Sequence, residues 1–343
     1  MKAPKKILIV RPDRIGDVVL TIPMVHVIKK HFPSAEVSIL IRSYTAPLVK
    51  NLKSLSNIFI LKERKDKIDF LSNLKILRQE NFDYAFVVHS KFLLALILCL
   101  SNIKTRIGTG YRWYSFLFNK KIYEHRKYGT NHELLHNMNM LKTIGINENV
   151  DEENVQFNIQ VDDESKQKVK NELSKTHFDK DKKTIIIHPG SGGSSKDLPF
   201  LKIKTLANLL AQQLFLNVIL TGSKSEIQMC NNIANKNKAL INLAGKFNLS
   251  ELTAVISLSN VVVANSTGPI HIAAALGKHA VGFYPKVKSC SQKRWGPFTN
   301  KKLIFEPEIN CSNCTVEQCE KLNCMDSIDV QKVFEKMKPL FNN

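Results

Sequence analysis

The chain has 343 residues, which is too long for one ordinary domain and enough for two domains with their own cores. Hydrophobic residues make up 43% and charged residues 23%, so we expect a folded globular protein and exclude a disordered one. The 50 lysines and arginines exceed the 30 acids and give a formal charge of +20. This charge favours an anionic binding partner such as nucleic acid, an anionic membrane surface or a phosphorylated substrate.

The apolar segments of the chain indicate neither export nor membrane insertion. The basic start, Met1 to Lys6, is followed by an apolar stretch that ends at Val10 and is too short for a signal peptide. The longest apolar run, Phe92 to Leu100, has nine residues, whereas a spanning helix needs about 20. We expect this run to be a buried helix, with an apolar anchor that dips into a bilayer surface as the alternative.

The first half alternates short β-rich runs with longer segments of helical periodicity, which predicts parallel βαβ units. Strands are expected at residues 7–10, 37–41, 58–61 and 84–88. In the helix after the first strand, Pro23 either causes a kink or lies in the first turn with Thr21 as cap. The charged segment Asp162–Lys183 is expected to be an exposed helix plus a linker between domains.

A basic turn, a glycine and a carboxylate follow the first strand. Arg11 and Arg14 would place positive charge beside Asp17, and Gly16 would allow a tight turn or a close approach to a ligand. Open parallel sheets bind ligands at the carboxyl ends of their strands, so Asp17 is the first candidate for catalysis. A structural role for Asp17 as a helix N-cap is the alternative.

The second half repeats the alternation and predicts a second doubly wound domain. Strands are expected at residues 184–187, 217–221, 240–242, 261–264 and 280–283, and helices at 199–213, 227–235, 250–258 and 269–276. Ser250 is the expected cap of the third of these helices.

The loop at residues 188–199 is rich in glycine and hydroxyl groups and precedes a helix. Gly190 would let backbone N–H groups approach an anion, Ser191 would donate a hydrogen bond, and Lys196 would supply a full positive charge. The loop matches neither the Walker nor the dinucleotide-binding fingerprint. This mismatch disfavours nucleotide hydrolysis and nicotinamide binding. We nevertheless expect phosphate contact here, because a second loop has the same features, with a flexible connector as the alternative.

A second loop leads into an apolar helix and also suits a phosphate. Ser266, Thr267 and Gly268 precede Pro269, which fits the first helical position, so the helix start would offer free N–H donors to a diphosphate. His271, on the first turn, could reach a ligand or could simply be packed.

Other strand ends carry weaker signals. Glu226 could bind ribose hydroxyls or could be an acid at a helix start, and residues 293–297 combine cations with Trp295 and could close over a nucleotide or sugar. His89 and His188 are expected to be structural.

Four of the seven cysteines lie close together near the end of the chain. They are Cys311, Cys314, Cys319 and Cys324. The first pair has zinc-like spacing and the second pair does not, so a structural metal, a disulfide and a reduced thiol cluster all remain open.

Several of these motifs resemble those of glycosyltransferase family 9, the ADP-heptose:lipopolysaccharide heptosyltransferases. The similar segments are Arg14-x-Gly16-Asp17-x-x-Leu20-Thr21-x-Pro23, His188-Pro189-Gly190, Lys196-x-x-Pro199, the run from Asn265 to Gly277, Arg106-Ile107-Gly108, His132-Glu133 and Cys324-Met325. The resemblance covers nearly the whole chain.

This resemblance implies an α/β fold of GT-B type, with two facing Rossmann-like domains that contain parallel sheets. The N-terminal domain, residues 1–165, would bind the acceptor, and residues 184–325 would bind the nucleotide sugar; residues 166–183 would be the linker and 326–343 a C-terminal helix. Asp17 matches the family's general base, with Arg11, Arg14 and Gly16 near the acceptor. The donor-side residues would be Gly190, Ser191, Lys196, Glu226, Ser266, Thr267, Gly268 and His271.

The implied activity is an inverting transfer of heptose from ADP-heptose to the lipopolysaccharide inner core, with no metal or other cofactor required. The implied place is the cytoplasmic face of an inner membrane, where the positive charge would meet phosphorylated lipid A, core sugars and anionic lipid. Ser266 replaces an acid that some members carry, which leaves another nucleotide sugar and surface glycan as an alternative. A non-catalytic protein that binds an anionic membrane or another polyanion is the alternative from a different class, but no nucleic-acid-binding pattern supports nucleic acid as the partner.

Overall fold

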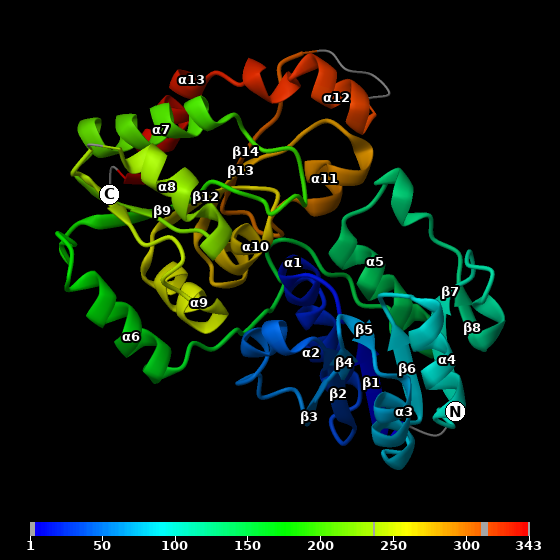
Figure 1. The fold of residues 1–343 in the computed structure, drawn as a ribbon. Coiled ribbons are helices and arrows are strands. Elements are labelled where there is room, and N and C mark those ends of the chain that lie inside the picture. The colour runs from blue at the N-terminus through cyan, green and yellow to red at the C-terminus, as the bar shows by residue number, and fades with distance from the viewer. Residues whose placement is uncertain (1–3, 236, 310–314, 342–343) are drawn as a thin grey trace. The chain divides into compact units, whose positions relative to one another are not determined.

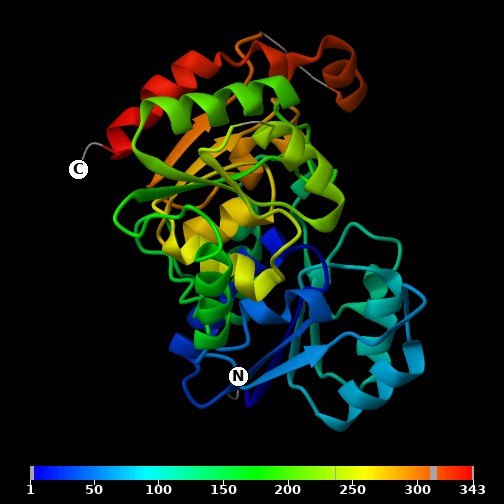
Figure 2. The same cartoon turned by 60° about the vertical axis from the view of Figure 1, so that its left-hand side comes forward.

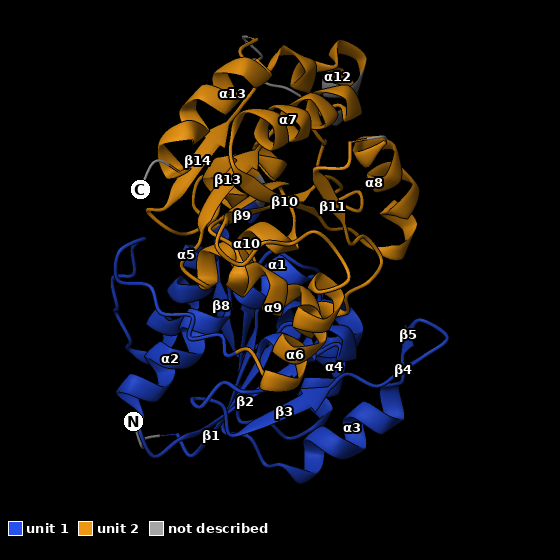
Figure 3. Ribbon diagram, turned by 90° about the vertical axis from the view of Figure 1, so that its left-hand side faces the viewer, with its two compact units in different colours: residues 1–126, 133–160 blue, residues 127–132, 161–343 orange. Residues whose placement is uncertain are grey.

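The computed structural model describes residues 4–235, 237–309 and 315–341. The chain forms two compact units (Figures 1 and 3). Unit 1 comprises Met1–Arg126 and Glu133–Gln160, and unit 2 comprises Lys127–His132 and Val161–Asn343. The chain therefore leaves unit 1 at residue 160, and a short segment before Glu133 belongs to unit 2.

Unit 1 contains a six-stranded parallel sheet with the order β3-β2-β1-β6-β7-β8. Its strands are β1 (Lys6–Val10), β2 (Glu36–Ile41), β3 (Asn57–Ile60), β6 (Tyr84–Val87), β7 (Thr105–Thr109) and β8 (Lys120–Ile122). A small hairpin, β4 (Glu63–Arg64) with β5 (Lys67–Ile68), follows β3. The four predicted strands are confirmed, and β7 and β8 extend the sheet beyond them. The central strand β1 is apolar and buried because neighbours cover both of its faces.

The helices of unit 1 connect these strands. They are α1 (Ile15–Val19), α2 (Ile22–His31), α3 (Phe70–Gln79), α4 (Phe92–Leu100) and α5 (Glu133–Asn139), with short 3₁₀ turns η2 (Ser115–Leu117) and η4 (Met140–Ile144) among the connections. Pro23 is the second residue of α2 and Thr21 precedes the helix, so the proline lies in the first turn. The apolar run is the helix α4, whose inner residues pack with β1, β2 and β6 in one core. Within the described ranges, no helix is both long and apolar enough to cross a bilayer.

Unit 2 repeats this architecture with the strand order β11-β10-β9-β12-β13-β14, again parallel. Its strands are β9 (Lys183–His188), β10 (Leu216–Leu220), β11 (Leu240–Asn242), β12 (Val261–Asn265), β13 (His279–Phe283) and β14 (Lys302–Phe305). The five predicted strands are confirmed and β14 is added. The neighbouring strands β9 and β12 form the topological switch point of the sheet. The loops that follow these two strands lead in opposite directions, and in such sheets this leaves a crevice at the carboxyl ends of the strands.

The helices of unit 2 are α6 (Asp163–Leu173), α7 (Phe200–Gln213), α8 (Ile227–Ala234), α9 (Leu249–Leu258), α10 (Gly268–Ala275), α11 (Gln292–Trp295), α12 (Val316–Leu322) and α13 (Val330–Met337). The cap of α9 is Asn248 and not the predicted Ser250. Its side chain accepts from the backbone N–H of Glu251, whose carboxylate accepts from Asn248 in return, so two end groups of the helix are satisfied at once.

Two segments that the sequence set apart belong to the body of unit 2. The helix predicted within residues 162–183 is present as α6, but it packs against α9, whereas residues 166–183 were expected to be a linker. Figures 1 and 2 both show α13, within the expected separate helix at 326–343, alongside α7. Phe334 of α13 is fully buried in the core of this sheet face. Both helices therefore contribute to the stability of unit 2.

Phe334→Ala should lower the free energy of unfolding of unit 2 by about 3–5 kcal/mol, because it leaves a cavity in a packed core. The measurement is urea unfolding followed by circular dichroism. Gln331→Ala, on the exposed side of the same helix, is the matched control and should change the free energy by less than about 0.5 kcal/mol. Equal effects of the two substitutions would show that α13 is not part of the core.

Candidate functional site

Arg11 lies at the carboxyl edge of the unit 1 sheet, directly after β1. Its side chain is only 3% exposed, and its backbone N–H donates to the carbonyl of Leu40 at 2.9 Å. The guanidinium is thereby fixed at the end of the central strand. A buried positive charge is costly unless acids neutralise it, so this position requires carboxylates around it.

Three carboxylates of unit 1 meet this guanidinium, two from the stretch that follows β1 and one from the start of α5. Nη2 of Arg11 donates to Oδ1 of Asp17, and Nε lies 3.0 Å from Oδ1 of Asp13. Nη1 and Nη2 lie 3.4 and 3.3 Å from Oε1 of Glu133, which also accepts a hydrogen bond from Arg126. These five residues are called the acid cluster below. The three acids and two guanidinium groups give the acid cluster one net negative charge. A carboxylate of this cluster can therefore accept a proton.

Asp17 does not cap a helix. The residue at the N-cap of α1 is Arg14, and Asp17 lies in the first turn with its side chain directed to Arg11. Arg14 is exposed, so the contact of Asp17 with a positive charge comes from Arg11. Gly16 is buried within α1 and has a helical backbone, so the tight turn expected at this glycine is not formed. The capping interpretation of Asp17 is therefore wrong.

The cluster drives the pKa values of its two aspartates apart. Burial raises the pKa of Asp17 to about 6, and the charges of Asp13 and Glu133 add to this effect while Arg11 opposes it. Burial acts in the same direction on Asp13, but Arg11 and a hydrogen bond from His89 hold the pKa of Asp13 below its usual value. Environments that move the pKa values of two carboxyl groups in opposite directions are typical of acid–base sites.

Sequence reasoning missed four members of this site: Asp13, His89, Arg126 and Glu133. Nδ1 of His89 lies 3.0 Å from Oδ2 of Asp13, so this histidine contacts the acid cluster although the sequence suggested only a structural role. Asp13 stands in the same run as Asp17, and Glu133 is part of the His132-Glu133 match. A separation of 122 residues between Arg11 and Glu133 hid their contact.

In unit 2, the two loops that were expected to bind phosphate are joined by a buried asparagine. Asn265, at the end of β12, donates from Nδ2 to the carbonyl of Pro189 at 2.6 Å and accepts from the N–H of Leu198 at 2.9 Å. The hydroxyl of Ser194 donates to the carbonyl of Ser266 at 2.8 Å. These hydrogen bonds hold the loop after β9 against the loop after β12 within a single unit.

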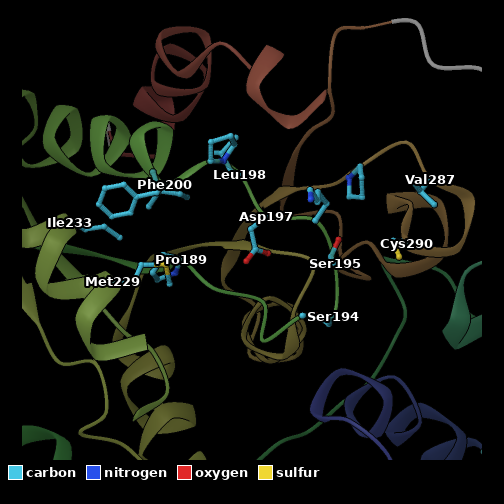
Figure 4. Close-up of a pocket in the computed structure, with 15 residues that line it drawn as sticks. Pro189, Ser194, Ser195, Asp197, Leu198, Phe200, Met229, Ile233, Val287 and Cys290 are labelled. Atoms are coloured by element: carbon cyan, nitrogen blue, oxygen red, sulfur yellow. The ribbon is translucent and has the colours of Figure 1, made fainter. Parts of the chain in front are cut away.

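A pocket of about 610 Å³ opens beside these loops (Figure 4). Its lining includes Ser194, Ser195, Lys196 and Asp197 on one side and apolar side chains such as Met229 on the other. This volume and mixture suit a small organic ligand with an apolar ring and a charged end. The side chain of Lys196 lines the pocket. Burial raises the pKa of the neighbouring Asp197, whose Oδ2 accepts a hydrogen bond from the N–H of Ser191 at 3.2 Å.

The helix α10 begins one residue earlier than predicted, at Gly268 and not at Pro269. Thr267 is the N-cap residue, Gly268 begins the helix and Pro269 is within its first two positions, which leaves N–H groups available to an anion. His271 is 3% exposed. Burial, and then the charge of His132, lowers the pKa of His271 to about 3, so this imidazole is neutral at physiological pH and brings no positive charge to the site.

Glu226 is engaged at the start of the turn before α8. Its carboxylate accepts from the N–H and the hydroxyl of Ser223, both at 2.6 Å, which is the capping role that the sequence allowed. A Cβ at Gly190 would collide with Oε1 of Glu226, so only a glycine permits this approach. Nδ1 of His188 is 3.0 Å from the hydroxyl of Thr221, and burial lowers the pKa of His188, consistent with a structural role.

Two further expectations concern the end of unit 2. Residues 293–295 of the predicted loop belong to the helix α11, and the indole N–H of Trp295 donates to the carbonyl of Ser289 in the preceding 3₁₀ turn η6 (Lys288–Cys290). Cys311, Cys314 and the side chain of Cys319 lie outside the described residues, and Cys324 is buried. Among the residues that the structure does describe, no group of three or more His, Cys, Asp or Glu side chains is placed to hold a metal ion.

Known proteins resemble the chain in sequence. A model of glycosyltransferase family 9 (heptosyltransferase) matches residues 71–325. The chain is 26% identical to the lipopolysaccharide core heptosyltransferase OpsX of Haemophilus influenzae over 355 aligned positions, which cover 99% of this chain and 98% of that protein.

Solved structures agree on the fold. The crystal structure of a family 9 glycosyltransferase from Veillonella parvula superposes with a TM-score of 0.83 at 17% identity, and covers 99% of this chain and 98% of that one. The ADP-heptose LPS heptosyltransferase II of E. coli gives a TM-score of 0.78 at 19% identity, with 98% of both chains covered. The fold is therefore of GT-B type, with one Rossmann-like sheet in each unit.

Glu133→Gln should lower the pKa of Asp17 below about 6, because it removes one of the negative charges that raise it. The measurement is the pH titration of the side-chain carboxyl carbon of Asp17 by NMR in protein labelled with ¹³C-aspartate. Glu63→Gln is the control, since Glu63 pairs with Arg42 outside the acid cluster. An Asp17 titration that stays in place or moves upward would disprove the assigned coupling.

Proposed function

The chain belongs to glycosyltransferase family 9, and from this premise we propose that it transfers a heptose from ADP-heptose to the inner core of lipopolysaccharide with inversion at the anomeric carbon. As a member of this family it is a glycosyltransferase that uses a nucleotide-sugar donor, so the alternative of a non-catalytic polyanion-binding protein is set aside. The observation that carries the proposal is the acid cluster, with the pKa of Asp17 raised and that of Asp13 lowered.

In this proposal Asp17 is the general base. The acceptor hydroxyl oxygen forms a bond to the anomeric carbon while the bond from that carbon to the diphosphate oxygen breaks, and the electron pair leaves with the nucleoside diphosphate. The hydroxyl proton passes to the carboxylate of Asp17. A base with a pKa of about 6 is ionised at neutral pH and is better matched to this transfer than an ordinary aspartate. Arg11 holds the carboxylate in place, and Arg14 and Gly16 lie on the acceptor side.

Unit 2 binds the donor in this proposal. The pocket beside Lys196 accepts the nucleoside, and Lys196 together with the N–H groups of Thr267 and Gly268 stabilises the departing diphosphate. Gly190, Ser191, Glu226, Ser266 and the neutral His271 complete the donor side. Protein groups thereby supply the charge stabilisation that magnesium supplies in other transferases, so the reaction would need no metal.

The acceptor and the place of action follow from the relatives and the charge. A relative such as the OpsX protein is named as a lipopolysaccharide core heptosyltransferase, so the proposed acceptor is lipid A that carries core sugars. The enzyme would work at the cytoplasmic face of the inner membrane, where a formal charge of +20 attracts anionic lipid. Ser266 supports one alternative, a different nucleotide sugar on the same scaffold, which a panel of nucleotide-sugar donors would reveal.

Asp17→Asn should reduce kcat by about 10²–10⁴-fold, because an amide cannot accept the proton. The affinity for ADP, measured by calorimetry, should stay within about twofold, since Asp17 belongs to unit 1. Release of ADP from ADP-heptose in the presence of truncated lipopolysaccharide provides the assay. The matched control is Asp163→Asn, because that carboxylate is 95% exposed.

The same assay gives a pH profile with a defined sign. In the wild-type protein, log(kcat/KM) should fall by about one unit per pH unit below about pH 6, as Asp17 becomes protonated. The Asp17→Asn protein should lack this limb. Turnover that is unchanged by the substitution, or a profile that keeps the acid limb, would remove Asp17 from the role of base.

Lys196→Ala should weaken the binding of ADP by about 10- to 100-fold, because a charge-assisted contact with the diphosphate is lost. The expected effect on adenosine, which has no phosphate, is less than about twofold. Lys204→Ala is the control from α7, since Lys204 does not line the pocket. Equal losses for ADP and adenosine would place Lys196 away from the diphosphate.

A further inference from the structure

The helix α4 is apolar on its outer face as well as on its inner one. Leu94, Ala95, Ile97 and Leu98 are buried. Phe92, Leu96 and Leu100, spaced by four, lie on the opposite side and are exposed or half-buried. None of the nine residues of α4 is charged, whereas the outer face of an ordinary surface helix is polar.

Large exposed side chains from neighbouring segments extend this face. Trp113 is 73% exposed and its ring centroid lies 4.7 Å from that of Phe92. Phe116, in the turn η2 that packs against α4, is 66% exposed. On the other side, α3 lies next to α4 (Figure 1) and carries Leu71, which is 74% exposed.

Positive charge surrounds these apolar side chains. An open groove along α3 is lined by Leu71 and Leu74 together with Lys75 and Arg78. Lys91 precedes α4 and Arg112 precedes Trp113, and both are exposed. Residues 70–123 contain eight lysines and arginines but two acids. Both acids are paired with lysines: Glu80 with Lys6 at 3.3 Å and Asp83 with Lys104 at 2.8 Å.

We propose that this face of unit 1 docks on the surface of an anionic bilayer. The docking surface is defined as the outward residues of α3, α4 and the loop before and within η2: Leu71, Lys75, Arg78, Lys91, Phe92, Leu96, Leu100, Arg112, Trp113 and Phe116. The apolar side chains enter the boundary between headgroups and acyl chains, and the cations contact lipid phosphates. The inference deepens the proposed function, because it names the surface by which the enzyme reaches a lipid-linked acceptor.

The composition of the surface favours lipid over a sugar or a protein. Aliphatic side chains such as Leu71, Leu96 and Leu100 offer no hydrogen bonds, which a sugar site requires, whereas a bilayer interface requires none from them. Exposed Trp beside Arg and Lys is typical of the headgroup level of a membrane. The charge is also complementary, because an excess of cations over acids suits acidic lipid.

One end of the docking surface lies near the carboxyl edge of the sheet in the same unit. The strand β6 ends at Val87 and α4 begins at Phe92, and β7 ends at Thr109 shortly before Trp113. Between β6 and α4 lies His89, which contacts Asp13 of the acid cluster. A bilayer on this surface would therefore lie on the unit that carries Asp17, next to the segment that joins β6 to α4.

The experiment is co-sedimentation of the full chain with vesicles of phosphatidylcholine that contain about 30% phosphatidylglycerol, and with vesicles of phosphatidylcholine alone. Binding to the anionic vesicles is expected, with weaker binding to the neutral ones and at high salt. Trp113→Ala with Phe116→Ala should reduce the affinity by about tenfold or more, as two exposed apolar side chains are lost. Lys91→Glu with Arg112→Glu should reduce it by at least about fivefold for each charge.

A matched control comes from unit 2. Leu201 and Phe215 are 71% and 79% exposed, so Leu201→Ala with Phe215→Ala removes a similar exposed apolar area and should leave vesicle binding unchanged. A second readout uses fluorescence, since the chain has two tryptophans. In Trp295→Phe protein, the emission of Trp113 should shift to the blue on addition of anionic vesicles and be quenched by brominated lipid.

The inference would be overturned by no binding to anionic vesicles, by equal losses in the two double-alanine proteins, or by a Trp113 emission that does not respond. A change of oligomeric state in the Trp113→Ala, Phe116→Ala protein with vesicle binding intact would also overturn it and would indicate a protein interface. The rate of sugar transfer to a lipid-free oligosaccharide acceptor should be the same in the Trp113→Ala, Phe116→Ala protein and in the wild type. Absence of transfer in the wild type would count against the proposed function alone, because vesicle binding is measured without substrates.

Discussion

The buried guanidinium of Arg11 is the constraint on which the architecture of unit 1 depends. It lies at the end of a central strand, where water cannot neutralise it, so three carboxylates must come to it. One carboxylate stands two residues away, one lies on α1, and one is at the start of α5. Their convergence fixes α1 and α5 at the carboxyl edge of the sheet and sets the protonation behaviour of the site.

The two units share a parallel doubly wound sheet but use its carboxyl edge differently. Unit 1 places charged side chains there, and these can position and accept a proton. Unit 2 places glycine-rich loops, the start of α10 and a pocket with one apolar side, which can hold an anion and the ring attached to it. A transfer reaction needs both properties, and each sheet supplies one through its loops while its interior stays an ordinary apolar core.

Part of the excess positive charge of this chain is concentrated on one surface of unit 1. In unit 1 it surrounds exposed apolar side chains on α3, α4 and the loop around Trp113. A helix with apolar residues on both sides satisfies two demands at once: the inner side closes the core of the sheet, and the outer side is available to an apolar phase. The sequence offered two interpretations of the apolar run, a buried helix and a membrane anchor. The helix α4 is packed on its inner side, and its outer side is the proposed anchor.

The sequence by itself determined the alternation of strands and helices, because apolar β-rich runs and helical periodicity are local properties. It also singled out Asp17 and the two loops that are proposed to bind an anion, since these follow strands directly. It missed β7, β8 and β14, which carry polar residues among their apolar ones. It predicted the helix α6 but treated its segment as a linker, because the packing of α6 against α9 involves residues far along the chain. Only the tertiary structure decided the partners of Arg11, the pKa of Asp17 and the exposure of Trp113, because burial and the contact between Arg11 and Glu133 arise between segments that the chain separates by more than a hundred residues.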